Sequence, residues 1–368
     1  MRCSAIRLTV CAAMLSLAAC GTLNPTSSSD DTTLVKGDNI TVGVLMPDKS
    51  STRYDQFDVP IIKKKVASLT DGHGKVAYAN AASDAGKQTS QMEKMITDGV
   101  DVIVLDAVDT HAIAGTVRKA KAAGIPVIAY ERLAEGPVDG HVTFDNAMVG
   151  EVQGRSLVEA LGAGIDPSAK VVMLNGSPSD PNARQFEQGA VSEMNGRVTV
   201  VASYDIMNWS PQIAQTRMTK ALTQYGAADV AAVYAANDAM AAGVLAAYRA
   251  AGVTAIPPIT GQDAELAAIQ RLLTGEQYMT VYKPYADEAE TAAEAAVTKI
   301  QGRSIEFDAL QPDTVDSPTD KDIPANFVSV AQVTKENIKN TVVADGIYQI
   351  SDICTAKYKT ACKDAGLI

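Results

Sequence analysis

The chain has 368 residues, of which 46% are hydrophobic and 20% are charged, and its formal net charge is −11. At roughly 100–200 residues per domain, this length allows two domains with appendages, and the composition is that of a globular protein with a large core. The acidic balance argues against a nucleic-acid partner, because binding to phosphate backbones requires clustered Lys and Arg.

The first twenty residues have the pattern of a secretory signal peptide. Arg2 and Arg7 precede an apolar run over 8–19, which is too short to span a bilayer as a mature helix. The run ends in LAAC, which resembles the bacterial lipobox, so we expect residues 1–19 to be removed and Cys20 to carry a lipid anchor. A plain signal peptide cut after a small residue is the alternative. Both interpretations predict export, and the anchored form would face the periplasm or the cell exterior.

Residues 20–38 are polar and rich in Ser and Thr, which predicts a flexible tether behind the anchor. In the body of the chain only Cys354 and Cys362 remain, eight positions apart. In an exported protein this spacing favours a disulfide over a metal site, worth about 2.6 kcal/mol in the chain-entropy model. The bond would pin a C-terminal tail over 346–368.

From residue 39 onward, short apolar runs alternate with longer amphipathic segments. The predicted strands lie at 40–46, 75–80, 101–107, 125–130, 141–145, 170–176, 198–204, 230–235, 257–260 and 278–282. Helix-length segments separate most of them, and several end at a glycine in the C-cap position. This alternation predicts parallel sheets built from right-handed crossovers, with helices on both faces.

Ten strands exceed one open sheet, so the sequence predicts an α/β fold with two doubly wound parallel-sheet lobes. The alternation breaks near 144–151 and near 282–290, and a strand and a short helix within 325–338 are predicted to return to the second lobe. Three chain crossings then form a hinge. The predicted N-terminal lobe comprises 39–146 and 286–324, and the predicted C-terminal lobe comprises 147–281 and 325–345.

Ligands of open α/β sheets bind beyond the carboxyl ends of the strands, so residues that follow each predicted strand are candidate contacts. The polar and aromatic residues at those positions are Arg53, Tyr54, Glu131, Arg132, Asp180, Asn182, Trp209, Asn237, Asp263 and Lys283. Trp209 is the only tryptophan and lies in a polar turn before a predicted helix, so we expect its ring to face the cleft between the lobes and not the core.

Helix capping is the alternative for some of these positions. Asp238, which begins a predicted helix, is predicted to be an N-cap, and Asp180 and Asn182 suit a cap or a ligand contact equally. Glu131 and Arg132 could also form a solvated ion pair of little energetic value. Capping alone does not account for so many polar residues in the same topological position on both lobes.

The charges of the candidate residues predict the kind of ligand. Three cations, Arg53, Arg132 and Lys283, balance three anions, Glu131, Asp180 and Asp263. A neutral ligand rich in hydroxyl groups fits this balance, because hydroxyls both donate to carboxylates and accept from guanidinium groups. The rings of Tyr54 and Trp209 would cover the apolar faces of a sugar such as a pyranose.

Seven segments, in this order and spacing, carry a resemblance to a known family: MEKMITDGVDVIVL, AYER, FDNAMVGE, NGSPSDPNA, AANDAMAAG, ITGQDAELAAIQRL and MTVYKP. As a set they resemble the bacterial periplasmic sugar-binding proteins of ABC transporters, above all the D-xylose-binding type and the related broad-range sugar-binding virulence protein of plant-associated bacteria. The resemblance covers about residues 40–345.

The resemblance implies the bilobal type I periplasmic-binding-protein fold, with xylose or a similar pentose or hexose held between lobes that close about the hinge. It implies delivery of the sugar to an ABC permease, and it places the family's ligand contacts on the same ten residues. Xylose-binding members typically have Asp where this chain has Glu131 and Trp where it has Tyr54. These two departures alter the reach of the carboxylate and the stacking face, so the sugar itself stays open.

The sequence gives less support to other functions. No phosphate-binding loop, nucleophile elbow or zinc-spaced cluster is found, and His73, His111 and His141 lie apart from any nucleophile motif, which argues against an enzyme. The effector domain of a LacI-type regulator has the same fold by resemblance, but the export signal and the lack of DNA-binding helices count against it. A sugar receptor for chemotaxis or a sensor kinase remains an alternative. We expect a monomer with no cofactor and no metal site.

Overall fold

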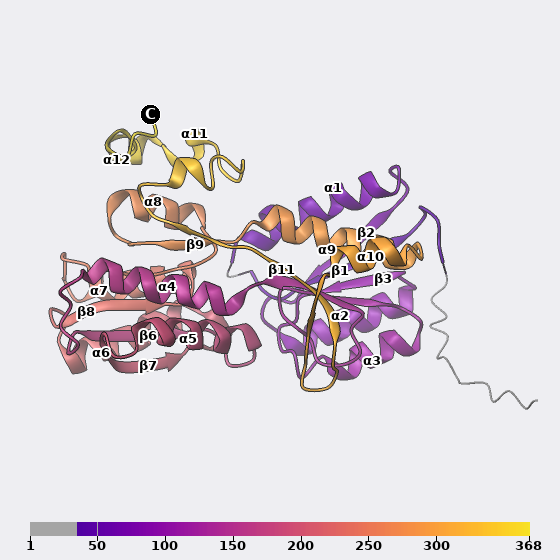
Figure 1. Ribbon diagram of the computed structural model, residues 1–368, viewed down its shortest axis with the longest axis horizontal. Helices are drawn as coiled ribbons and strands as arrows, with labels where there is room; N and C mark the ends of the chain where they lie inside the picture. The colour runs from indigo at the N-terminus through magenta and orange to yellow at the C-terminus, as the bar shows by residue number, and fades with distance from the viewer. Residues whose placement is uncertain (1–34, 50) are drawn as a thin grey trace, which may run out of the picture. The chain divides into compact units, whose positions relative to one another are not determined.

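The computed structural model describes residues 35–49 and 51–368. The predicted signal peptide, the Cys20 anchor and most of the predicted tether lie outside the described residues. Across the described ranges the chain forms two α/β lobes, each with a parallel sheet (Figure 1). No helix within those ranges is long and apolar enough to cross a membrane.

The N-terminal lobe is built on a seven-stranded sheet with the order β10-β11-β5-β4-β3-β1-β2. All neighbouring strands are parallel except the pair of β10 and β11. The strands are β1 (Thr41–Met46), β2 (Lys75–Asn80), β3 (Val102–Leu105), β4 (Val127–Tyr130), β5 (Gly140–Phe144), β10 (Asp313–Val315) and β11 (Ile323–Val328).

Helices cover both faces of this sheet. One face packs against α1 (Val59–Leu69) and α9 (Tyr285–Ile300), with α10 (Ser304–Leu310) beside α9. The other face packs against α2 (Ala85–Asp98) and α3 (Ala114–Ala122), as Figure 1 shows. The long helix after the second break was predicted to pack on this lobe, and the contacts of α9 confirm that prediction.

The C-terminal lobe has a parallel three-stranded sheet with the order β7-β6-β8 and an antiparallel pair of β9 and β12. Isolated bridges of Val233 with Ile259 and of Gln262 with Val281 extend β8 toward this pair. The strands are β6 (Lys170–Asn175), β7 (Thr199–Asp205), β8 (Val230–Ala235), β9 (Thr280–Tyr282) and β12 (Ala331–Val333). The helices are α4 (Asn146–Leu161), α5 (Pro181–Met194), α6 (Pro211–Tyr225), α7 (Asp238–Ala250) and α8 (Leu266–Thr274).

Local sequence signals set the helix ends. Ser210 accepts a hydrogen bond from the backbone N–H of Ile213 and Pro211 is the first residue of α6, so the turn after Trp209 starts this helix. Helices α4 and α5 pack closely because glycine lies at their contact. A Cβ atom at Gly150 would come within 2.0 Å of the carbonyl oxygen of Phe186.

The C-terminal tail packs against the C-terminal lobe. Its helices α11 (Ile350–Ile353) and α12 (Lys359–Asp364) lie next to α8, and the 3-10 turns η3 (Ile338–Asn340) and η4 (Ala356–Tyr358) precede them. A disulfide joins Cys354 and Cys362, as their spacing predicts.

Two sequence predictions about strands are wrong. The segment 257–260 forms one isolated bridge at Ile259 and no strand, because it is short and begins with two prolines, which cannot donate to a ladder. Of the segment 325–338 that was predicted to return to the second lobe, only the later part does: β12 pairs with β9 there. Residues 325–328 belong to β11, which pairs with β5 in the first lobe, so the predicted boundary is wrong. The third crossing therefore lies between Val328 and Ala331, not at 324–325. The two-lobed parallel-sheet fold with three crossings is otherwise as predicted.

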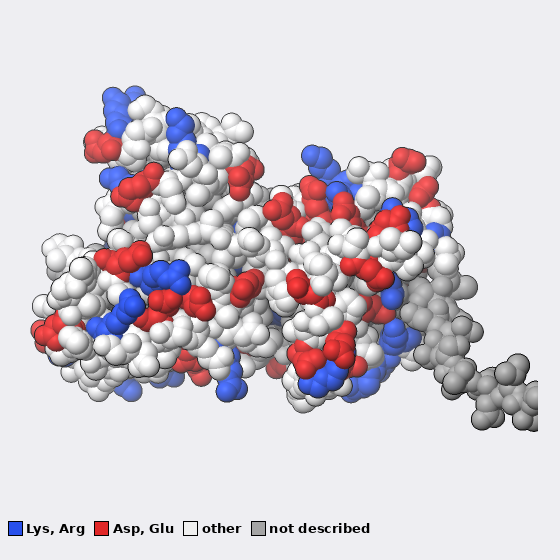
Figure 2. All heavy atoms as spheres, viewed as in Figure 1, with Lys and Arg blue, Asp and Glu red and all other residues white. Residues whose placement is uncertain are grey.

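Basic and acidic side chains are interspersed over the face of the molecule shown in Figure 2. That face offers no continuous basic surface of the kind that binds phosphate backbones.

Candidate ligand-binding site

A narrow polar cavity lies between the lobes, next to the carboxyl ends of strands from both sheets. Its free volume is about 20 Å³, which is room for about one water molecule, so a small-molecule ligand can enter only when the lobes move apart. The lining residues are Asp48, Ser51, Tyr54, Glu131, Arg132, Asp180, Phe186, Trp209, Asn237, Gln262, Asp263 and Lys283. Eight of the ten sequence-predicted site residues are among them.

The N-terminal lobe contributes residues that follow β1 and β4. Asp48 and Ser51 lie in the loop after β1, and Tyr54 begins a five-residue π-helical turn, η1 (Tyr54–Asp58), that leads into α1. Single π-helical turns occur frequently at functional sites. Glu131 and Arg132 come directly after β4.

The C-terminal lobe contributes residues at two helix starts. Asp180 is the N-cap of α5 and accepts from the N–H of Asn182, and Asn237 is the N-cap of α7 and accepts from the N–H of Met240. The prediction of Asp238 as a cap is therefore wrong by one residue. Its buried carboxylate instead accepts hydrogen bonds from Gln277 and Thr280.

Three residues of the cavity wall have a strained backbone. Glu131 (φ 54°), Trp209 (φ 53°) and Asp263 (φ 91°) all have the positive φ that favours glycine. Each such position costs on the order of 1–3 kcal/mol and persists only where the surrounding structure requires it. Six other non-glycine residues of the described chain have positive φ outside this wall, so the strain accompanies the cavity and does not identify it by itself.

Lys283 bridges two carboxylates inside the cavity. Its Nζ lies 2.9 Å from Glu131 Oε1 and 2.9 Å from Asp263 Oδ1, and its side chain is almost fully buried. Burial lowers the pKa of Lys283, but Asp263 and Glu131 outweigh it and raise the pKa above the ordinary value. Burial alone would raise the pKa of Glu131, whereas Arg53, Lys283 and Arg132 lower it to about 2. Both groups are charged at neutral pH.

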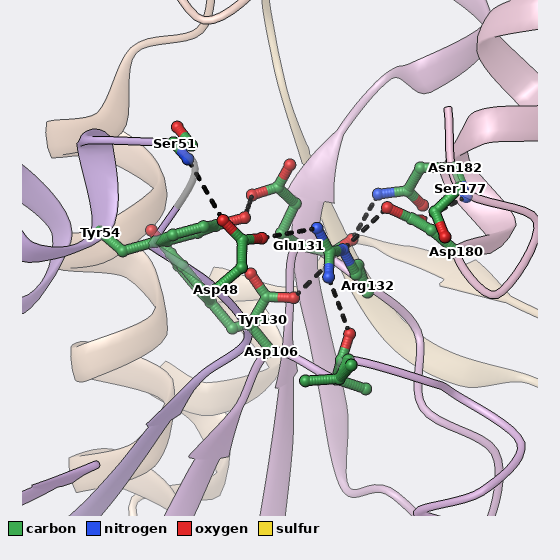
Figure 3. Close-up of polar contacts among 12 residues, drawn as sticks. Asp48, Ser51, Tyr54, Asp106, Tyr130, Glu131, Arg132, Ser177, Asp180 and Asn182 are labelled. Carbon is green, nitrogen blue, oxygen red and sulfur yellow. Dashed lines mark hydrogen bonds and ion pairs between the residues drawn. The ribbon is translucent and has the colours of Figure 1, made fainter. Parts of the chain in front are cut away.

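Arg132 lies among carboxylates of both lobes, as Figure 3 shows. Its Nε is 2.8 Å from Asp180 Oδ2, and its guanidinium lies 3.6 Å from both Asp48 and Asp106. Its Nη1 donates to the carbonyl of Ala107 at 3.0 Å. Arg132 and Asp180 thus form an ion pair between the lobes.

Trp209 lies closer to the core than its polar neighbours predict. Its ring is only 6% exposed, belongs to the hydrophobic core cluster of the C-terminal lobe and packs edge-on against Phe186 at 6.1 Å between ring centroids. Its Nε1 donates to Asp180 Oδ2 at 3.1 Å. The prediction of a ring outside the core is wrong, although the ring also lines the cavity.

Arg53 and Asn182 do not line the cavity. Arg53 is 1% exposed and lies behind Glu131, where it forms ion pairs with Asp58, Glu131 and Glu288. Asn182 donates from Nδ2 to the backbone carbonyl of Glu131 at 3.2 Å, which joins α5 to the N-terminal lobe. Both residues support the site from outside its wall.

The sequence missed four lining residues: Asp48, Ser51, Phe186 and Gln262. Asp48 and Gln262 also follow strand ends, so the topological rule could have selected them; Phe186 lies within α5 and carries no such signal. With Asp48 included, four carboxylates and two cations line the cavity. The predicted balance of three against three is therefore wrong. The surplus of acceptors favours a ligand that donates several hydrogen bonds.

Within the described ranges, no group of three or more His, Cys, Asp or Glu side chains is arranged to hold a metal ion.

Comparisons with known proteins all point to periplasmic solute-binding proteins. A family profile described as a periplasmic binding protein domain matches residues 42–304. The chain is 35% identical over 320 residues to the D-xylose-binding periplasmic protein of Escherichia coli (strain K12), which covers 85% of this chain and 92% of that relative. It is 32% identical over 337 residues to the multiple sugar-binding periplasmic receptor ChvE of Rhizobium radiobacter, over 86% of this chain and 93% of that one.

A solved structure is similar over most of its length. An ABC transporter solute-binding protein from Clostridium phytofermentans, solved with bound β-D-glucose, has a TM-score of 0.76 and 27% sequence identity. The match covers 85% of this chain and 99% of that one.

Proposed function

The chain belongs to the periplasmic binding protein family, whose members are solute-binding proteins and not enzymes, and from that premise we propose that it captures a neutral monosaccharide between its two lobes. The proposed ligand is xylose or a similar pentose or hexose. The names of the similar proteins, which include a xylose binder and a structure with bound glucose, support this sugar class.

The chemistry of the cavity wall is the observation that carries the proposal. Asp48, Glu131, Asp180 and Asp263 supply charged acceptors for sugar hydroxyls, and Arg132 and Lys283 supply charged donors. The rings of Tyr54, Phe186 and Trp209 are available for the apolar C–H faces of a sugar. An anionic ligand would meet a surplus of negative charge in this cavity.

We propose that the sugar contacts are the eight predicted residues in the wall, together with Asp48, Ser51 and Gln262. Closing the lobes over the sugar removes water and strengthens each of these polar contacts. The predicted contacts Arg53 and Asn182 would act through Glu131, which both of them touch.

Delivery and location complete the proposal. The signal pattern supports export, the lipobox resemblance supports anchoring at Cys20, and the family supports an ABC permease as the partner of the monomer. A role as a sugar receptor for chemotaxis or a sensor kinase is the second candidate, since the Rhizobium radiobacter relative is described as a receptor.

Isothermal titration of the mature domain against a panel of neutral aldoses tests the function. We expect heat with at least one pentose or hexose and a matching rise in melting temperature, since a ligand that binds only the native state stabilises it. If no sugar of the panel produces binding heat or a shift in melting temperature, the proposal of sugar binding is contradicted.

A further inference from the structure

Three different nitrogens of Arg53 each lie next to a carboxyl group. Its Nε lies 2.9 Å from Asp58 Oδ2, its Nη1 lies 2.9 Å from Glu131 Oε2 and its Nη2 lies 2.5 Å from Glu288 Oε2. The three carboxyl groups come from three elements: the end of η1, the residue after β4 and the first turn of α9. Nε and Nη2 therefore form hydrogen bonds, whereas the contact of Nη1 with Glu131 is an ion pair by distance without hydrogen-bond alignment.

Aromatic rings enclose the guanidinium as well. Its central carbon lies 4.6 Å from the ring centroid of Tyr285, 5.3 Å from that of Tyr54 and 5.6 Å from that of Phe144. Such contacts are stabilising for a desolvated cation. With 1% of its surface exposed, Arg53 has no access to the cavity.

Of the three carboxylates, only Glu131 lines the cavity. Its Oε2 faces Arg53 and its Oε1 faces Lys283, each at 2.9 Å. Each carboxylate oxygen has two lone pairs, and Oε2 also accepts from the Tyr54 hydroxyl at 3.5 Å. The acceptor capacity that remains for a ligand therefore lies on Oε1, which accepts from Lys283 Nζ. The two cations on either side fix the plane of this carboxylate, and hence the directions from which a hydroxyl can donate to it.

We propose that Arg53 is a positioning residue that does not touch the sugar but fixes the Glu131 carboxylate, and thereby determines which arrangement of sugar hydroxyls the site accepts. This inference rests on the proposed function of sugar binding. It replaces the direct contact that the sequence predicted for Arg53. The order of the charges that lower the pKa of Glu131, with Arg53 ahead of Lys283 and Arg132, agrees with it.

A double-mutant cycle tests the proposal, because residues that act as a unit are not additive. Arg53→Lys keeps the positive charge, but one ammonium cannot meet three carboxylates in the fork geometry. We expect Arg53→Lys to weaken binding of the best sugar about tenfold and to reduce the discrimination between that sugar and its epimers. In a Glu131→Gln background, the same change should alter affinity less than about twofold. Equal losses in both backgrounds would show that Arg53 contacts the ligand directly and overturn the proposal.

Two further variants keep the test decisive. Arg155→Lys makes the same chemical change on the surface of α4, where Arg155 pairs with Glu193, and should leave affinity and selectivity unchanged. Should Arg53→Lys fail to fold, Asp58→Asn is nearly isosteric and loosens the Nε corner of the fork. It should lower epimer selectivity in the same direction, and unchanged selectivity would count against the proposal.

A measurement without sugar separates this proposal from the proposed function. The pKa of Glu131 can be followed by carboxyl ¹³C NMR in the unliganded protein, where Arg53→Lys should move it from about 2 toward its ordinary value. An unchanged pKa would overturn the role of Arg53 even if the wild type binds sugar. If the wild type binds no sugar but Arg53→Lys still shifts the pKa of Glu131, the proposed sugar function is contradicted and the role of Arg53 in positioning Glu131 is not.

Discussion

The carboxylate of Asp180 both caps a helix and contributes to the wall of the candidate site. Its Oδ1 accepts from the N–H of Asn182 at the start of α5, while its Oδ2 lies near Arg132 Nε and accepts from the indole of Trp209. Burial raises its pKa, and Arg132 counteracts that effect. For this residue the capping interpretation and the ligand interpretation are therefore compatible, because the two oxygens face different partners.

The buried position of Trp209 changes what its substitution should do. We expect Trp209→Ala to weaken sugar binding at least tenfold and also to destabilise the fold by about 3–5 kcal/mol, because the indole leaves a cavity against Phe186. Trp209→Phe keeps most of the packing and removes the N–H bond to Asp180, so it should weaken binding with a smaller loss of stability. Titration calorimetry and urea unfolding would measure the two effects.

The wild-type protein supplies its own signal for this residue. Since Trp209 is the only tryptophan, its emission should change when sugar binds. If Trp209→Ala and Trp209→Phe both bind sugar with wild-type affinity, the indole ring is not part of the sugar-binding site.

Glu288 should make stability depend on pH on the alkaline side. Burial raises its pKa to about 8, with Arg53 opposing the shift and Glu131 and Asp58 adding to it. Between about pH 4.5 and 8 the native state keeps a proton that the unfolded state releases, so this contribution to stability is full below about pH 4.5 and is lost as pH rises through 8. The Glu288→Gln variant has no ionisable group at this position, so its stability does not decrease in this way as pH rises. Its free energy of unfolding relative to wild type should therefore rise by about 2–4 kcal/mol from pH 5 to pH 8.

Urea unfolding at several pH values measures the change. Glu290→Gln is the matched control, because Glu290 lies on the same helix with half of its side chain exposed and pairs with Lys65 at the surface. Its stability should run parallel to that of the wild type. Parallel curves for Glu288→Gln as well would mean that Glu288 is ionised at neutral pH.

At the scale of elements, hydrophobic runs identified strands well where a strand is buried on both faces. β8 has the predicted bounds and β1 differs by one residue. β2, a part-exposed edge strand, also has the predicted bounds. The prediction failed for β11, which alternates buried and half-exposed residues at the hinge and lies next to an edge strand. Which sheet such a strand joins depends on tertiary packing with β5, and no local pattern in the sequence encodes that choice.

The candidate site was predictable for a similar reason. The carboxyl ends of parallel strands meet at one edge, so position relative to a strand end located most of the wall from topology alone. The depth of a side chain was not predictable from that position. Arg53 and Tyr54 are neighbours after the same strand, yet Tyr54 faces the cavity and Arg53 faces the interior, because a π-helical turn begins between them.

At the scale of the whole molecule, contacts inside and outside the cavity join the lobes. Inside is the Arg132–Asp180 ion pair, and directly behind the cavity wall is the hydrogen bond from Asn182 to the backbone carbonyl of Glu131. Outside, Phe57 of η1 packs edge-on against Tyr348 of the C-terminal tail, with 5.8 Å between ring centroids, and stacks on Tyr285. Tyr54 and Phe57 lie on the same π-helical turn, so one short element carries both a residue of the cavity wall and a contact with the C-terminal tail.

Phe57→Ala should therefore weaken every sugar by the same factor. It removes a contact of the closed arrangement without changing the cavity wall, and apparent affinity scales with the fraction of molecules that can close. We expect a threefold to tenfold loss that is equal for the best sugar and its epimers, and a larger radius of gyration by small-angle scattering at subsaturating sugar. Tyr358→Ala, which disturbs the tail without touching η1, should leave affinity unchanged. A change in selectivity in Phe57→Ala would instead mean that η1 had shifted Tyr54 within the cavity, and unchanged affinity would mean that the aromatic contact does not contribute to closure.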